Sequence, residues 1–78
     1  MRFKTKEHYN AIEIELKGNI IGGPETQDFH NMIKDFLAEG KKNIIVNLGS
    51  VKFMNSTGLG MLIGAFTSVK NADGKFVI

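Results

Sequence analysis

The stretch VNLGSVKFMNSTGLG, residues 46–60, decides the fold because it carries the chain from a strand into a helix. It starts within an almost continuous apolar run, residues 44–48, which is typical of a strand buried on both faces in parallel pairing. A Gly-Ser pair breaks this run, and four further residues lead to a second helix that we expect to begin near Ser56.

This second helix combines one apolar face with several glycines. Gly58, Gly60 and Gly64 each cost roughly 1 kcal/mol relative to alanine in a helix interior. They therefore indicate close backbone packing or a site that needs access. Residues 71–74 end the helix, and residues 75–78 begin another strand. The predicted apolar face consists of Leu59, Leu62, Ile63, Phe66 and Val69.

The first half of the chain predicts a hairpin followed by an amphipathic helix. Residues 2–7 and 11–17 alternate between two faces, and Tyr9-Asn10 between them suits a tight turn. Residues 18–23 form a predicted connector, after which Pro24 suits a first helical turn. Gly40 ends this helix. Its apolar face consists of Phe29, Met32, Ile33, Phe36 and Leu37.

The resulting order, β-β-α-β-α-β, predicts an α/β fold with a mixed central sheet. A chain of 78 residues has room for a single domain, residues 1–78. The sequence stops three or four residues into its last strand. We therefore expect a C-terminally truncated domain in which the last strand and a C-terminal helix are incomplete or absent.

Composition removes several classes of function. The formal net charge is only +2 and the lysines never form a run of five, which disfavours direct nucleic-acid binding. The absence of cysteine excludes disulfides and thiolate metal sites. The N-terminus lacks the apolar core of a signal peptide, and no stretch approaches the ~20 apolar residues of a membrane span. We expect a cytoplasmic protein, and the sequence does not specify its oligomeric state.

Ser56 is the residue to which the sequence assigns chemistry. Serine is a preferred N-cap, and a helix N-terminus offers unpaired N–H groups and about half a positive charge. A phosphate on Ser56 would add about −1.5 to −2 charge where backbone donors can hold it. Thr57 is a competing hydroxyl that lies inside the first turn. The alternative is that Ser56 is an ordinary cap worth about 1 kcal/mol.

Residues 46–60 resemble the central motif of STAS domains, the fold of bacterial anti-sigma factor antagonists. The motif runs from a hydrophobic strand through an aromatic residue to Asp, Ser, Ser or Thr, Gly, and then Leu or Ile, and the element order matches along the whole chain. The resemblance implies that the unmodified protein binds an anti-sigma factor that is also a serine kinase. It further implies that phosphorylation of Ser56 blocks this binding and that a serine phosphatase restores it.

The chain departs from this pattern at three acidic positions. Asn55 and Asn47 stand where the family usually has aspartate, and residues 21–24 replace a loop that often carries another acid. We expect the loss of carboxylates near Ser56 to make a phosphate easier to accommodate. The same loss removes groups that could position a kinase or pair with basic residues of a partner.

The predicted partner-binding surface combines the start of the second helix with the loop before the first. Met61 lies off the main apolar stripe and is the best candidate for an exposed apolar anchor. Small glycines are expected to leave this end of the helix unshielded. The predicted surface consists of Gly22, Gly23, Glu25, Asn55, Ser56, Thr57, Gly58, Leu59, Gly60 and Met61.

Two other functions are compatible with the sequence: a fixed STAS scaffold, such as a subunit of a lipid-transport or stress-signalling complex, and a small-ligand or nucleotide-binding module. A dinucleotide site is disfavoured because the glycine spacing is GxGxxxG and no acid follows about 20 residues later. His8 and His30 lack the spacing of metal ligands, and Ser56 has no triad partner that the sequence identifies. We expect no enzymatic activity, no catalytic residue, no metal and no cofactor.

Overall fold

Alternating apolar side chains place one face of a sheet against two helices. The computed structural model describes residues 2–78. β1 (Arg2–His8) pairs antiparallel with β2 (Ala11–Ile20) across a turn at Tyr9 and Asn10, which confirms the predicted hairpin.

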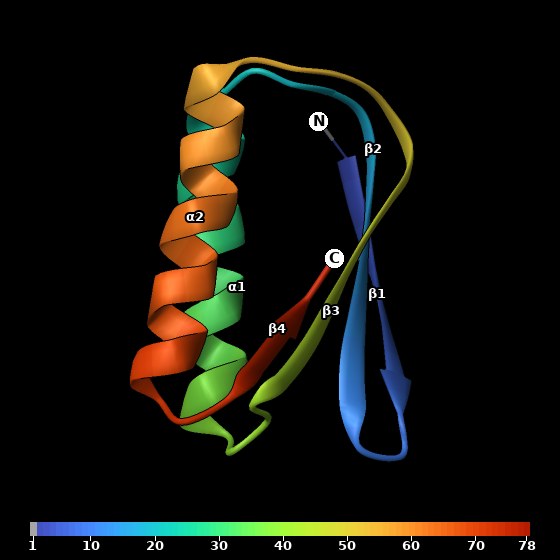
Figure 1. Ribbon diagram of the computed structural model, residues 1–78. Coiled ribbons are helices and arrows are strands. Elements are labelled where there is room, and N and C mark those ends of the chain that lie inside the picture. The colour runs from blue at the N-terminus through green and yellow to red at the C-terminus, as the bar shows by residue number, and fades with distance from the viewer. Residues whose placement is uncertain (1) are drawn as a thin grey trace.

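The rest of the sheet is parallel. β3 (Asn43–Met54) pairs with β2, and β4 (Lys75–Val77) pairs with β3, so the sheet order is β1-β2-β3-β4. α1 (Pro24–Ala38) connects β2 to β3, and α2 (Ser56–Asn71) connects β3 to β4. Both helices lie on the same face of the sheet (Figure 1). The predicted element order and mixed sheet are confirmed.

Both central strands run further than predicted. Residues 18–20 belong to β2 rather than to a connector, and the Gly-Ser pair at 49–50 does not break β3. The β2–β3 ladder shifts register on either side of residues 17–18, where Gly18 has a φ of 82°. Because glycine tolerates this left-handed conformation, the irregularities are absorbed as bulges and pairing continues to the ends of both strands.

The core lies between the sheet and the helices. The predicted apolar face of α1 is confirmed, since Phe29 and Ile33 are fully buried and its other apolar residues pack against them. No helix among residues 2–78 is long and apolar enough to cross a bilayer. The buried apolar residues are Ile12, Ile14, Leu16, Ile20, Phe29, Ile33, Ile44, Val46, Met61, Leu62, Ala65 and Val69.

The opposite face of the sheet is not covered by either helix (Figure 1), which corrects the prediction that the apolar run of β3 is buried on both faces. Ile45 and Asn47 alternate with fully buried residues of β3 but are only half-buried themselves. This open face also carries opposite charges on neighbouring strands, with Lys6 beside Glu13 in the register. One-sided burial is the usual state of a sheet whose strands alternate apolar and polar residues.

Gly58 sets the rotation of α2 about its axis. A Cβ at this position would clash with the carbonyl group of Ile20, so the helix backbone approaches β2 as closely as only glycine permits. The face that points toward the sheet is therefore the one that carries this glycine. It consists of Gly58, Met61, Leu62, Ala65 and Val69.

The predicted apolar face of α2 is consequently wrong in part. Leu62 and Val69 are buried, but Leu59, Ile63 and Phe66 are 50%, 56% and 44% exposed. Apolar residues occur almost all round this helix, so periodicity alone could not select the buried face. An apolar groove of about 330 Å³ runs beside β4 and is lined by Leu59, Leu62, Ile63, Phe66, Phe76 and Ile78.

Gly58→Ala should destabilise the fold, whereas Gly60→Ala should not. Overpacking typically costs 1–3 kcal/mol, and we expect about 3 kcal/mol at Gly58 because the clash is with backbone that cannot rotate away. A Cβ at Gly60 would meet no atom within 4 Å. Alanine there should therefore raise the free energy of unfolding by about 0.5–1 kcal/mol, because alanine has a higher helix propensity than glycine. Urea unfolding followed by circular dichroism measures both. Equal effects of the two substitutions would contradict this account of α2.

Candidate functional site

The candidate site lies where the carboxyl ends of β2 and β3 meet the first turns of both helices (Figure 1). This end of parallel strands is where ligands commonly bind in open α/β sheets. The loop of residues 21–23, between β2 and α1, contacts the start of α2 through Gly22 and Thr57. The two segments that the sequence predicted as one surface are thus adjacent.

Asn55, rather than Ser56, is the N-cap of α2. Its backbone is extended, with φ −96° and ψ −178°, and its Oδ1 accepts a hydrogen bond from the backbone N–H of Gly58 at 2.8 Å. Asparagine is as good an N-cap as serine because its side-chain oxygen reaches the same orphan donors. The expectation that Ser56 caps the helix is therefore wrong by one residue.

Ser56 is the first residue of α2, and its side chain is exposed. Its hydroxyl makes no hydrogen bond with any residue of the described chain, 2–78. The first turn of α2 contains no acidic residue, so the positive end of the helix dipole is not offset by a carboxylate there. An enzyme could reach this hydroxyl, and negative charge added to it would be favourably placed.

Thr57 differs from Ser56 in packing against the loop. A Cβ at Gly22 would lie 2.6 Å from Cγ2 of Thr57, so the threonine methyl group occupies the space beside this glycine. Gly22 and Gly23 have φ values of 87° and 102°, in the region that favours glycine. A side chain at Gly22 would be both strained and crowded, which explains why the loop is glycine-rich at this point.

Asn47 does not belong to the site. Its Nδ2 donates to Glu13 at 3.2 Å and its Oδ1 accepts from the backbone N–H of Gly49 at 2.8 Å, both on the open face of the sheet. The end of β3 lies seven residues further on, or about 20 Å along an extended strand. The expectation that Asn47 affects a phosphate on Ser56 is therefore wrong.

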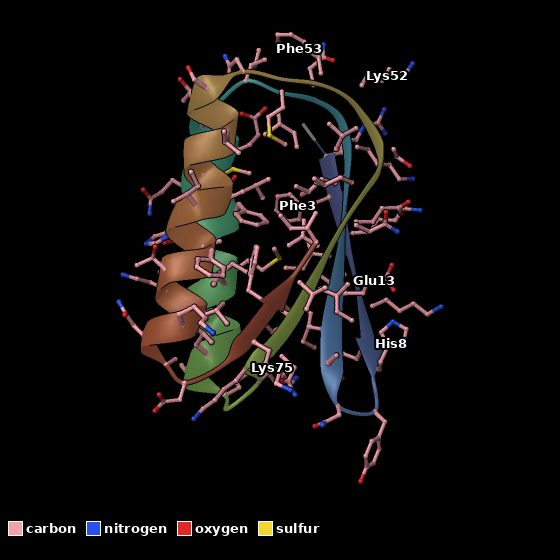
Figure 2. All side chains as sticks on the ribbon, viewed as in Figure 1. Phe3, His8, Glu13, Lys52, Phe53 and Lys75 are labelled. Carbon is pink, nitrogen blue, oxygen red and sulfur yellow. The ribbon has the colours of Figure 1, made fainter. Side chains whose placement is uncertain are left out.

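Glu13 is held in its charged form on that open face. Its hydrogen bond with His8, at 2.8 Å, is the main reason that its pKa lies below the usual value, and the hydrogen bond from Asn47 lowers it further. Figure 2 shows His8 and Glu13 well away from the end that carries Phe53. An acid at position 47 would consequently meet Glu13 and not a modified Ser56.

Two predicted contact residues are not on the surface. Met61 is only 7% exposed and lies in the core, which corrects its assignment as an exposed anchor. Gly58 is buried against Ile20, so it closes this end of the helix instead of leaving it unshielded. Gly60 does face open space, and Leu59 is half exposed. Both corrections follow from the rotation of α2 that Gly58 imposes.

Sequence reasoning missed two apolar residues at the site. Phe53 near the end of β3 (Figure 2) and Ile21 in the loop are each 56% exposed, and Leu59 in the first turn of α2 is 50% exposed. We call the exposed residues at this end of the sheet the Ser56 surface: Ile21, Phe53, Ser56 and Leu59. A large apolar residue directly before two glycines was the signal for Ile21, because such a loop leaves few neighbours to cover it.

This arrangement is compatible with covalent modification of the Ser56 hydroxyl and with binding of another protein. No cluster of three or more potential metal-ligating side chains is present among the described residues. Within the same residues, neither a histidine nor a carboxylate hydrogen-bonds to Ser56. Exposed apolar residues around a polar centre are instead typical of a protein interaction site.

The chain is similar in sequence to a known protein. The anti-sigma-B factor antagonist of Staphylococcus epidermidis is 26% identical over 80 residues, which cover all of this chain and 71% of that relative. The chain thus spans about 71% of the length of this relative.

Solved structures share the fold. The anti-sigma factor antagonist SpoIIAA in its unphosphorylated form superposes with a TM-score of 0.80 at 20% identity, over 97% of this chain and 71% of that one. The phosphorylated form of SpoIIAA, a Bacillus cell fate determinant, gives a TM-score of 0.81 at 20% identity, over 99% of this chain and 70% of that one. A family model of the STAS domain matches residues 2–78, which is nearly the whole sequence. Because this match covers nearly the whole chain, the chain belongs to the STAS domain family.

Proposed function

We propose that this protein is an anti-sigma factor antagonist that binds an anti-sigma factor with serine kinase activity and is released when Ser56 is phosphorylated. The Staphylococcus relative is named an anti-sigma-B factor antagonist, which supports the general role. SpoIIAA is described in both unphosphorylated and phosphorylated forms, which supports a cycle of modification.

The exposed Ser56 hydroxyl at the start of α2 is the single observation that carries this proposal. It makes no hydrogen bond within the described chain, and the exposed apolar residues Ile21, Phe53 and Leu59 lie at the same end of the sheet. An apolar surface of this kind buries favourably against a partner, and a central hydroxyl can be buried with it at modest cost. A doubly charged phosphate at the same point cannot be buried at modest cost, unless the partner supplies cationic side chains that pair with it.

The switch is therefore electrostatic. Phosphorylation adds about −1.5 to −2 charge and three acceptor oxygens in the middle of the Ser56 surface. The first-turn N–H groups of α2 stabilise this charge in the free protein, while the partner must desolvate it on binding. We place the protein in the cytoplasm as a single domain, with a serine phosphatase returning it to the binding form.

Phosphorylation at Ser56 can be tested directly. After incubation with the cognate anti-sigma kinase and ATP, we expect intact mass spectrometry to show one added phosphate, assigned to Ser56 by fragmentation. Ser56→Ala should abolish the gain, whereas Thr57→Ala should preserve it because Thr57 packs its methyl group against Gly22. No gain with the unsubstituted protein would exclude the switch.

The effect on binding separates a switch from a fixed scaffold. We expect Ser56→Asp to weaken binding to the anti-sigma factor at least about tenfold, since even one buried negative charge carries a large desolvation cost. Ser56→Ala should bind as well as the unsubstituted protein. Equal affinity of the two variants in calorimetry would instead favour a scaffold whose contacts ignore this residue.

The apolar part of the surface gives a further prediction. Phe53→Asp should weaken binding about thirtyfold or more, because a large exposed aromatic residue at an interface is a typical hot spot. Tyr9→Asp is the matched control, since Tyr9 is a fully exposed aromatic residue at the hairpin turn, at the opposite end of β2. If both variants bind equally well, the partner does not contact the Ser56 surface.

A further inference from the structure

We propose that Asn55 is a positioning residue whose side-chain amide clamps the loop of residues 21–23 against the start of α2 and so preforms the Ser56 surface. The consequence for binding rests on the proposed function. The clamp itself is a property of the free protein and can be measured without any partner.

Asn55 uses the two ends of its amide in opposite directions. Its Oδ1 accepts from the N–H of Gly58 at 2.8 Å, which caps α2, and its Nδ2 donates to the carbonyl oxygen of Ile21 at 3.3 Å. Its backbone N–H also donates to the carbonyl oxygen of Ile20 at 3.2 Å. One residue thus links the end of β2, the loop and the helix.

Only an amide can make both side-chain bonds. A carboxylate is an acceptor at both oxygens, so aspartate could still cap Gly58 but would turn a negative oxygen toward the carbonyl of Ile21. Serine could also cap Gly58 but is too short to bridge to the loop. Both substitutions should therefore keep the cap and remove the clamp.

The clamp matters because the loop consists of residues that are costly to order. Gly22 and Gly23 are consecutive glycines with positive φ, and glycine loses more conformational freedom on ordering than any other residue. Ile21, which the loop presents to solvent, is one of the apolar residues of the Ser56 surface. If the loop is already ordered in the free protein, binding does not have to order it and loses less conformational entropy. The clamp should therefore raise the affinity for the partner.

The clamp is tested by ¹⁵N relaxation of the free protein. In the unsubstituted chain we expect order parameters near 0.85 at Gly22 and Gly23, falling toward about 0.6 in both Asn55→Asp and Asn55→Ser. Asn19→Asp is the matched control for Asn55→Asp. It adds the same negative charge at the end of β2 but leaves the side-chain amide of Asn55 in place. Unchanged order parameters in both variants, or an equal fall in the control, would overturn the clamp.

The coupling to binding is tested with the same variants by calorimetry against the anti-sigma factor. Loss of one such hydrogen bond should weaken affinity about threefold to tenfold in Asn55→Asp and Asn55→Ser alike, with the neutral serine excluding a pure charge effect. A loosened loop with unchanged affinity would refute the preformed surface. If the unsubstituted protein does not bind at all, the proposed function fails, while the relaxation data still decide the clamp.

Discussion

The contact between the backbone of Gly58 and the carbonyl group of Ile20 is the constraint on which the rest of the structure depends. It fixes both the distance and the rotation of α2 relative to β2. Met61 and Leu62 consequently enter the core, while Leu59 and Ser56 remain outside. A single hydrogen atom in place of a side chain thus decides which residues of this helix stabilise the fold and which are available to a partner.

The same contact brings together two segments that are far apart in the sequence. Because α2 starts directly above the end of β2, its first turn lies beside the loop that leaves that strand, and Gly22 leaves room for Thr57. Asn55 then bridges the remaining gap with polar bonds. The Ser56 surface is composite for this reason: Ile21 comes from the loop, Phe53 from β3, and Ser56 and Leu59 from α2.

Much of this architecture follows from local patterns. Alternation in residues 11–17 identified the inner face of β2, and the spacing of Phe29 and Ile33 identified that of α1. The position of Ser56 at the start of a helix was also predictable. The buried face of α2 was not, because its residues are apolar on several sides and a backbone contact made the choice. The end of β2 was not predictable in this way, because a glycine such as Gly18 is typical of a break, although its positive φ lets the strand continue through a bulge.

The N-cap of α2 and the exposed hydroxyl belong to different residues, Asn55 and Ser56, and this has a physical consequence. If Ser56 were the N-cap, its oxygen would be engaged with the helix, and a phosphate on it would disturb the bond that starts α2. Because Asn55 provides the cap, the Ser56 hydroxyl carries no structural hydrogen bond within the described chain. Charge can therefore be added at Ser56 while the helix start remains intact. Under the proposed function, phosphorylation would therefore change recognition without unfolding the helix start.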